Sequence, residues 1–462
     1  MNNIYILKQN WRLYLLFTGV PITSISGNNV SSGFEKPNIL VFMADDLGTH
    51  ELSCYGGENI VTPNIDRLAN EGMLFNHNYA SATMSVPIRA SLYTGLYPVR
   101  HGSYQNHKSS NPDIKSITNY LPELGYRVGR SGKRHSTPKS VYDFVEIPGF
   151  EVDCVSKTAH YSTDGIKEFI LRDEQPFCLF VCSIHPHVPW TWGDKEEIDS
   201  EKIVLPPNFV DNPDTRNIYR DYLAEINALD KEVGSVIKML EETGKLNNTL
   251  IIFLGEQGPQ FPFGKWTCYR YGQHSAFIAR YPDKIEAGRI SNAMIQYEDI
   301  LPTLIDFCGG DIVKEMDGRS FLEVLYGNKE EHRNWVYGIH NNIPEGTAYP
   351  IRSIQNKKYK LIMNLTPEVN YFEKHLMNAN IRGQGWNSWL ESAKDNPEAK
   401  SLVDRYVKRP ALEFYDIEND PWELINLGDN QQYAEIISMM ENELHKWMLQ
   451  QEDKGVAMDI PF

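Results

Sequence analysis

Continuous apolar runs alternate with amphipathic stretches along much of the chain. The runs are typical of strands buried on both faces of a sheet. They are Asn38–Met43, Tyr126–Arg130, Phe177–Ile184 and Thr249–Leu254. Helical periodicity is found between them, near residues 62–72, 116–124 and 218–242. This alternation predicts an α/β fold in which helices sandwich a large mixed, mostly parallel sheet.

The pattern changes near residue 335. Alternating apolar and polar residues predict antiparallel strands at Tyr349–Ile354 and Lys358–Ile362, a third strand at Leu412–Asp416, and a closing helix over about 433–450. A chain of 462 residues suits one large domain with a smaller partner. We therefore expect an N-terminal catalytic domain over residues 28–334. The C-terminal subdomain, residues 335–462, would hold a small antiparallel sheet and a helix.

The first 27 residues read as a targeting segment. Lys8 and Arg12 precede the apolar run Leu13–Phe17, and small residues follow. This order resembles a secretory signal peptide, the alternative being a disordered tail. It predicts a secreted or periplasmic protein. No later apolar stretch is long enough to span a bilayer.

Charge and cysteine content narrow the classes of partner. The formal net charge of -16 argues against binding to nucleic acid or acidic membranes through bulk electrostatics. None of the six cysteines has zinc-type spacing, and most are expected to be buried thiols.

Polar clusters follow each of the apolar runs. They are Asp45-Asp46, Lys133 with His135, His185 with His187, and Glu256-Gln257. Ligands of parallel sheets bind beyond the carboxyl ends of the strands, so these clusters are expected to meet in one site. Asp45, Asp46, Glu256 and Gln257 supply the hard oxygen ligands that Ca²⁺ or Mg²⁺ prefers. A solvated turn is the alternative for the Asp-Asp pair alone.

A further segment, Ser85 to Gly95, predicts an anion site. Proline suits a first helical turn, so Pro87 is expected to open a helix with Ser85 beside its N-terminus. Arg89 lies one turn later on the same face and can return to whatever Ser85 holds. The alternative is a Ser-capped helix with a surface arginine.

Ser85-Val86-Pro87-Ile88-Arg89, with the small-residue helix ending in Thr94-Gly95, resembles the signature of the sulfatase family. Other motifs of that family are matched by Gly132-Lys133-Arg134-His135, by His187-Val188-Pro189 and by the distal Lys265. The resemblance covers nearly all of the mature chain and is closest to the N-sulfoglucosamine sulfohydrolase branch. The stretches that carry the closer resemblance are Gly132–Tyr142, Tyr349–Leu365 and Leu412–Leu427.

The resemblance implies an alkaline-phosphatase-like fold and a catalytic aldehyde, formylglycine (3-oxoalanine), made from Ser85 by a serine-accepting maturation enzyme. The aldehyde would hydrate to a diol that attacks sulfur. The metal ligands implied are Asp45, Asp46, Ser85, Glu256 and Gln257, with Ca²⁺ favoured over Mg²⁺.

The other family roles follow residue by residue. Arg89 and Lys133 would hold the diol and the sulfate oxygens. His187 with Lys265 would protonate the leaving group, and His135 would accept a proton from the diol. Lys133, His187 and Lys265 would also contact the substrate.

The implied substrate is a sulfated sugar, the N-sulfated glucosamine of heparin or heparan sulfate. The enzyme would remove the sulfate group from this sugar where it stands at a chain end. Exo action follows if C-terminal residues close the pocket. Those expected to do so are His340, Asn341, Asn342 and Arg352, although His340 could instead be a structural strand-end residue.

The sequence departs from the family pattern in two ways. Glu256-Gln257 stands where Asp-Asn or Asp-His is usual, so each side chain is one methylene longer, and Ser85 replaces cysteine. A flexible calcium shell absorbs longer ligands better than an octahedral magnesium site does. Three alternatives stay open: an O-sulfatase for another glycan, a phosphodiester or phosphonate hydrolase of the same superfamily, and an inactive binder of sulfated glycans.

Overall fold

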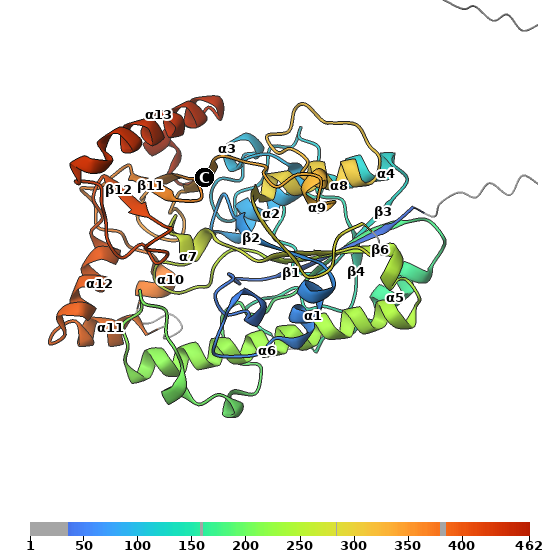
Figure 1. Cartoon of the computed structure of the whole chain (residues 1–462), viewed down its shortest axis with the longest axis horizontal. Helices are drawn as coiled ribbons and strands as arrows, with labels where there is room; N and C mark the ends of the chain where they lie inside the picture. The colour runs from blue at the N-terminus through green and yellow to red at the C-terminus, as the bar shows by residue number, and fades with distance from the viewer. Residues whose placement is uncertain (1–35, 158–159, 283, 379–384) are drawn as a thin grey trace, which may run out of the picture. The chain divides into compact units, whose positions relative to one another are not determined.

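An eight-stranded sheet lies between two layers of helices (Figure 1). The computed structural model describes residues 36–462 apart from 158–159, 283 and 379–384, and Lys36–Phe462 form one compact unit. The predicted signal segment, residues 1–27, lies outside the described residues.

The large sheet has the strand order β4-β3-β5-β1-β6-β7-β2-β8. Its strands are β1 (Asn38–Ala44), β2 (Met73–Tyr79), β3 (Arg127–Gly132), β4 (Val145–Ile147), β5 (Phe177–Cys182), β6 (Thr249–Gly255), β7 (Phe277–Arg280) and β8 (Arg289–Gln296). Among these described strands only β7 runs against its neighbours; all other adjacent pairs are parallel. The predicted mixed, mostly parallel sheet is confirmed.

Helices cover both faces of this sheet. One face packs against α1 (Pro63–Glu71), α5 (Asp164–Leu171) and α6 (Pro213–Glu242). The other packs against α2 (Ser85–Thr94), α4 (Ile117–Glu123), α8 (Ile300–Phe307) and α9 (Leu322–Leu325). Alternate residues of β1 explain the two cores, because Leu40 and Phe42 point into the first and Ile39, Val41 and Met43 into the second.

A smaller antiparallel sheet follows near the predicted boundary at residue 335. Its order is β12-β11-β10-β9, formed by β9 (Val336–His340), β10 (Ile351–Gln355), β11 (Tyr359–Asn364) and β12 (Leu412–Asp416). The closing helix α13 (Ala434–Gln450) packs on it through a core that includes Leu361, Phe414 and Leu444. The shorter helices are α3 (Pro98–His101), α7 (Arg270–Gln273), α10 (Lys374–Met377), α11 (Trp386–Ser392) and α12 (Pro397–Val407).

Several predicted boundaries were wrong by a few residues. Helix α6 begins at Pro213 rather than near 218, because the Asn212 side chain caps it by accepting a hydrogen bond from Thr215 N at 2.8 Å. Helix α2 begins at Ser85 itself, two residues before Pro87, with Met84 as its extended N-cap. Strand β5 ends at Cys182 rather than at residue 184.

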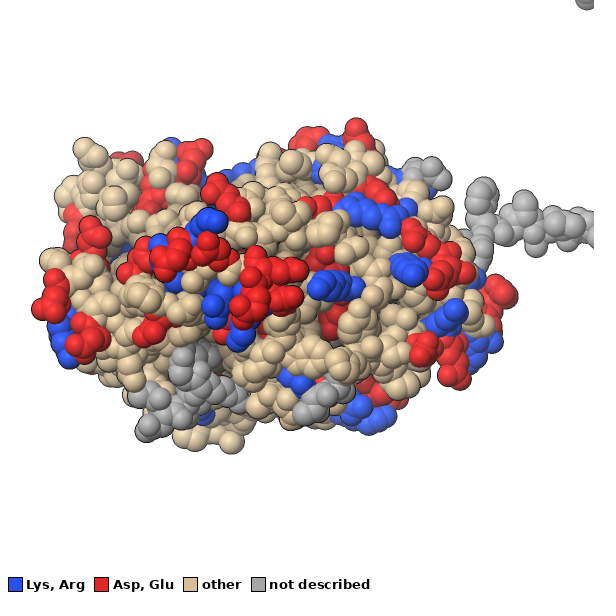
Figure 2. Space-filling view, turned by 90° about the horizontal axis from the view of Figure 1, so that it is seen from below, with Lys and Arg blue, Asp and Glu red and all other residues tan. Residues whose placement is uncertain are grey.

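The distribution of surface charge and the burial of the cysteines agree with what the composition predicted. Figure 2 shows acidic side chains spread among Lys and Arg, without a continuous basic area on the face that carries α6. All six cysteines are free thiols, and five of them are buried. Within the described part of the chain, no helix combines the length and apolar character needed to cross a bilayer.

Candidate active site

The predicted polar clusters follow four strands that are direct neighbours, in the order β3-β5-β1-β6. Because these strands are parallel, their carboxyl ends lie at one edge of the sheet. Two glycines allow the close approach there. A Cβ at Gly255 would lie 2.2 Å from Leu47 O, and one at Gly132 would lie 2.0 Å from Cys182 O. The structure thus brings the predicted clusters together at one edge of the sheet.

Three acidic residues form the centre of this site. Oxygen atoms of Asp45, Asp46 and Glu256 lie within 4.8 Å of one another, and all three residues are buried. Asp45 Oδ1 and Gln257 Oε1 are also buried and have no hydrogen-bond partner among the described residues. Converging carboxylates with orphaned oxygen acceptors fit a hard divalent cation. Asp45, Asp46 and Glu256 thus have the chemistry and placement of metal ligands. Gln257 lies beside them, but its Nε2 donates to Asp46 Oδ1 at 2.5 Å and to Glu256 Oε2 at 3.0 Å, so its amide must flip before Oε1 can serve as a ligand.

Basic side chains face each of these carboxylates. Lys133 Nζ donates to Asp45 Oδ2 at 2.5 Å, Arg89 Nε to Glu256 Oε1 at 2.5 Å, and Lys265 Nζ to Asp46 Oδ2 at 2.8 Å. Burial alone would lower the pKa of Lys133, but the adjacent Asp45 outweighs it and the pKa is raised. The site is therefore a buried, charge-paired cluster that can hold both a cation and a tetrahedral anion.

Ser85 lies between an acidic and a basic side chain of this cluster. Its Oγ donates to Glu256 Oε2 at 2.8 Å and accepts from Lys133 Nζ at 3.1 Å. Arg89 follows one turn later on α2 and reaches the same Glu256 carboxylate, as the spacing predicted. Ser85 is only 2% exposed, so its hydroxyl belongs to the cluster and not to the surface.

Both predicted catalytic histidines are neutral in this environment. Burial, then the charges of Lys133 and Arg89, lower the pKa of His135 to about 2. Burial, then Lys265 and Lys133, lower the pKa of His187 well below its usual value. His187 Nδ1 donates to the carbonyl of Val188 at 2.6 Å, so the neutral ring presents Nε2, 3.7 Å from Asp46 Oδ2, as an acceptor.

Two residues predicted to contact substrate lie elsewhere. Arg352 is fully buried and binds Asp453 through two nitrogens at 2.5 and 2.9 Å. His340 is buried at the end of β9, where Nε2 lies 3.1 Å from Asn342 Oδ1. Within the described chain, neither side chain contacts a member of the strand-end cluster. These contacts give Arg352 and His340 a role in holding the smaller sheet.

A support for His187 was not predicted. Lys157 donates to the main-chain carbonyl of His187 and to Glu225 on α6, and both side chains are buried. Glu225 Oε1 also accepts from Thr191 N at 2.7 Å and Trp192 N at 3.1 Å. Glu225 thus anchors the loop that carries His187. Glu225 is a charged residue within the apolar face of α6, and this position was the sequence feature that could have indicated its role.

A second set of polar residues, also missed, lies beside the cluster. Glu345 is held by Asn106 Nδ2 at 2.5 Å, by His375 Nε2 at 2.6 Å and by His107 Nε2 at 3.4 Å. The His107 ring lies 6.2 Å from that of His135. These residues come from loops and from the one-turn helix α10 (Lys374–Met377), which carry no periodic pattern, so only the fold brings them together.

Comparisons with known proteins agree with this geometry. The model of the family described as Sulfatase matches residues 37–310, and the one described as N-sulphoglucosamine sulphohydrolase, C-terminal, matches residues 258–379. An ulvan-active sulfatase from Formosa agariphila is 33% identical, with 91% of this chain and 81% of that protein covered. Human N-sulphoglucosamine sulphohydrolase is 28% identical, with 91% of each chain covered.

A solved structure of a protein in complex with its substrate, D-glucosamine-2-N,6-O-disulfate, has the same fold. The TM-score is 0.67 at 22% identity, with 91% of this chain and 99% of that chain covered. This similarity confirms the predicted alkaline-phosphatase-like fold class.

Proposed function

The chain belongs to the sulfatase family, whose members hydrolyse sulfate esters and sulfamates, and we propose that it removes the N-sulfate group from a terminal glucosamine of heparin or heparan sulfate. The observation that carries this substrate is the family match over residues 258–379, described as the C-terminal part of N-sulphoglucosamine sulphohydrolase. That segment supplies Lys265, Trp266, Glu345 and His375, which lie around the cluster.

These residues support a closed rim around the sulfate site. On one side, His135 contacts His107, which contacts Glu345. On the other side, His375 binds Glu345 and stacks on Trp266 with 5.4 Å between ring centroids. Lys265 Nζ lies 5.0 Å from the centre of the Trp266 ring. The contacts run without a break from His135 to Lys265, which suits a pocket that admits a chain end.

Glu345 provides a negative charge in this rim. Burial acts to raise the pKa of its carboxyl group, but hydrogen bonds from His107, His375 and Asn106 outweigh burial and lower the pKa. Lys374 Nζ also lies 3.5 Å from this carboxylate. Glu345 therefore forms a paired, polar part of the rim, which suits the hydroxyl and amine groups of a sugar.

The chemistry we propose uses Ser85 as the residue that a serine-accepting maturation enzyme oxidises to formylglycine, which supplies the nucleophilic hydroxyl. Asp45, Asp46, Ser85, Glu256 and Gln257 would hold a divalent cation, and Ca²⁺ suits the longer Glu and Gln side chains best. When bound, the cation supplies positive charge that stabilises the attacking oxygen and the sulfate oxygens.

The remaining side chains bind, orient and move protons. Lys133 binds Ser85 directly, and Arg89 binds the Glu256 carboxylate that Ser85 also binds, so both cations suit sulfate oxygens at this position. His135 is neutral, and its buried Nδ1 has no partner among the described residues. We assign it the role of proton acceptor, which requires the anionic substrate to offset the charges of Lys133 and Arg89 that lower its pKa. Lys265 Nζ and His187 Nε2 both approach Asp46 Oδ2, at 2.8 and 3.7 Å, and we assign this pair to the leaving-group side of the site.

Sulfate release from a defined panel tests the substrate. The panel contains N-sulfoglucosamine, glucosamine 6-sulfate, a terminal and an internal N-sulfated residue of a heparin oligosaccharide, and an aryl phosphate. We expect release from N-sulfoglucosamine and from the terminal residue, with none from the Ser85→Ala variant. Release from glucosamine 6-sulfate alone would overturn the N-sulfate specificity and leave the family assignment standing.

An O-sulfatase acting on another glycan is the second candidate, supported by the 33% identity to the ulvan-active sulfatase. A sulfated ulvan oligosaccharide added to the panel separates the two, because only an O-sulfatase releases sulfate from it. Export from the cell, as a secreted or periplasmic protein, suits either polysaccharide. The mass of the mature N-terminus tests whether residues 1–27 are removed.

A further inference from the structure

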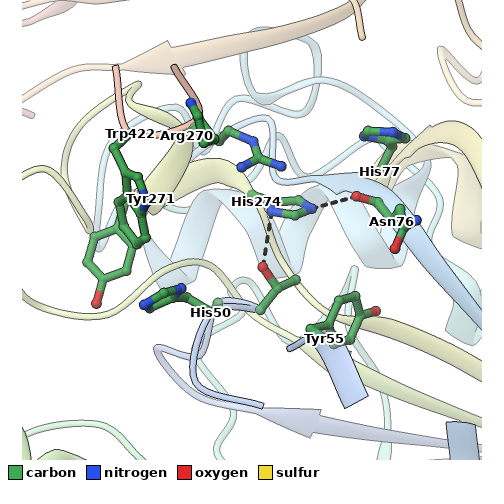
Figure 3. A pocket seen from close by; sticks show the side chains of 11 residues that line it. His50, Tyr55, Asn76, His77, Arg270, Tyr271, His274 and Trp422 are labelled. Atoms are coloured by element: carbon green, nitrogen blue, oxygen red, sulfur yellow. Dashed lines mark hydrogen bonds between the residues drawn. The ribbon is translucent and has the colours of Figure 1, made fainter. Parts of the chain in front are cut away.

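A pocket of about 450 Å³ is lined by residues outside the strand-end cluster (Figure 3). Its 11 lining residues come from the loop after β1, from β2, from α7 and from the loop after β12. None of them belongs to the cluster of carboxylates and bases described above. The volume is in the range of sites that take a small molecule.

Arg270 brings to the pocket a positive charge that no salt bridge among the described residues pairs. Its guanidinium is drawn toward the centre of the pocket in Figure 3. The nearby Glu423 accepts the main-chain N–H of Arg270 at 2.8 Å and lies 3.3 Å from Lys360 Nζ. No carboxylate of the described residues forms an ion pair with the guanidinium. Such a half-buried arginine is suited to bind an anion through two nitrogens.

Three imidazoles stand around this arginine. His274 is fixed, because Nε2 donates to Asn76 O at 2.7 Å and Nδ1 accepts from Thr49 Oγ1 at 3.0 Å. His77 uses only Nδ1, 3.2 Å from Tyr79 Oη, and the described residues offer no hydrogen bond to either ring nitrogen of His50. His50 and His77 therefore present free polar nitrogens to a ligand.

The charge of Arg270 reaches all three rings. Burial, then Arg270, lowers the pKa of His77 to about 4 and that of His274 well below its usual value. Burial lowers the pKa of His50 as well, with Glu51 opposing and Arg270 reinforcing the shift. The imidazoles are neutral at pH 7 and serve as hydrogen-bonding groups for hydroxyls.

Aromatic rings form the remaining wall. Trp422 meets His50 edge to face, with ring centroids 4.5 Å apart, and lies 5.7 Å from Tyr271. The Tyr271 hydroxyl is engaged by Glu51 at 2.9 Å, so this residue offers its ring to the pocket. A half-buried indole beside polar nitrogens suits a ligand with one apolar face and several hydroxyls.

We propose that this pocket binds one saccharide unit that carries an anionic group. The anion pairs with Arg270, the ring lies against Trp422, and the hydroxyls bond to His50 and His77. The anion is a sulfate ester or a carboxylate, since both match the guanidinium. The pocket is thus a second sugar site, and its occupation does not depend on which sulfate the enzyme removes.

Calorimetric titration of the full-length Ser85→Ala protein tests this site without turnover. The probes are glucosamine 6-sulfate, glucuronic acid, glucosamine and inorganic sulfate. Arg270→Ala should remove one binding event for an anionic sugar, or weaken it at least about tenfold, because a charge-assisted contact is lost. Arg319→Ala, which removes an exposed arginine elsewhere, should change nothing. Trp422→Ala should weaken the same event.

Thermal melting confirms that each variant is folded, and Arg270→Gln replaces Arg270→Ala if the latter unfolds. Comparing glucosamine 6-sulfate with glucuronic acid shows which anion the site takes. Unchanged titrations in both Arg270 variants would overturn the proposal. Equal affinity for glucosamine, or for inorganic sulfate alone, would also overturn it, because the site would then lack either its anion or its sugar component.

Discussion

Arg89 and Glu256 form an ion pair in which Nε and Oε1 are 2.5 Å apart and neither side chain is exposed. Glu256 is one of the three positions, with Ser85 and Gln257, at which the sequence departs from the pattern of the sulfatase family. Its second oxygen accepts from Ser85 at 2.8 Å. The longer side chain therefore binds, through one carboxylate, both residues that the signature places one turn apart.

Glu256→Ala is expected to destabilise the protein by about 3–5 kcal/mol, because it leaves Arg89 buried without its closest partner. The free energy of unfolding in urea measures this. The matched control is Glu398→Ala, which removes an exposed glutamate from the first turn of α12 and should change stability by less than about 1 kcal/mol. Equal stability of the two variants would contradict a structural role for the pair.

The double variant Glu256→Asp with Gln257→Asn restores the side-chain lengths that are usual at these two positions in the family. If the backbone of this protein is set for the longer side chains, the double variant should bind Ca²⁺ more weakly. The rise in melting temperature with added Ca²⁺ reports this affinity. Tighter binding would show that Glu and Gln are accommodated here with strain.

Outside the site, the buried Asp299–Arg333 ion pair should make the free energy of unfolding depend on pH in the acid range. Arg333 binds both carboxylate oxygens at 2.5 and 2.6 Å, and His332 lies 3.1 Å away. Burial acts to raise the pKa of Asp299, but Arg333 and then His332 outweigh it, and the pKa is lowered. The unfolded chain then binds more protons than the native state below about pH 4, so stability is lost as pH falls.

Urea unfolding between pH 7 and pH 3 checks this sign. Asp299→Asn should be less stable than the wild type by about 3–5 kcal/mol at pH 7, and the difference should shrink toward pH 3. A difference that stays constant with pH would mean that the carboxylate charge contributes nothing.

His187 and the leaving group provide a kinetic prediction. An amine takes up a proton more readily than an alkoxide, so loss of a proton donor should matter less for an N-sulfate. Lys265→Met should therefore slow an O-sulfate substrate more than an N-sulfate one. His187→Ala should show the same order if His187 takes up a proton at Nε2, an acceptor in this state, when substrate binds. Ratios of kcat/KM on paired substrates measure the effect. Equal slowing of both substrates argues that neither side chain donates to the leaving group.

The sequence predicted the centre of the site far better than its rim. Asp45, Lys133, His187 and Glu256 each follow a buried strand, and parallel strands bring such positions to one edge. Glu345 meets its partners through loops, whose paths depend on side-chain packing that no periodicity encodes.

Arg352 was predicted to contact substrate but instead lies buried in an ion pair. A lone arginine in an alternating strand gave no sign of its acidic partner, Asp453, about a hundred residues later. Long-range pairs of this kind follow from tertiary packing. Helix ends were missed for a local reason, since the Asn212 cap lies outside the apolar pattern that was used to find α6.

The mass of the tryptic peptide Leu68–Arg89, which contains Ser85, tests the central claim most directly. In protein that releases sulfate, we predict a peptide about 2 Da lighter than the serine form, because two hydrogens are lost when the nucleophile is activated. Activity should rise in proportion to the oxidised fraction and vanish in Ser85→Ala. Full sulfate release by protein whose peptide has only the unmodified serine mass would contradict the account.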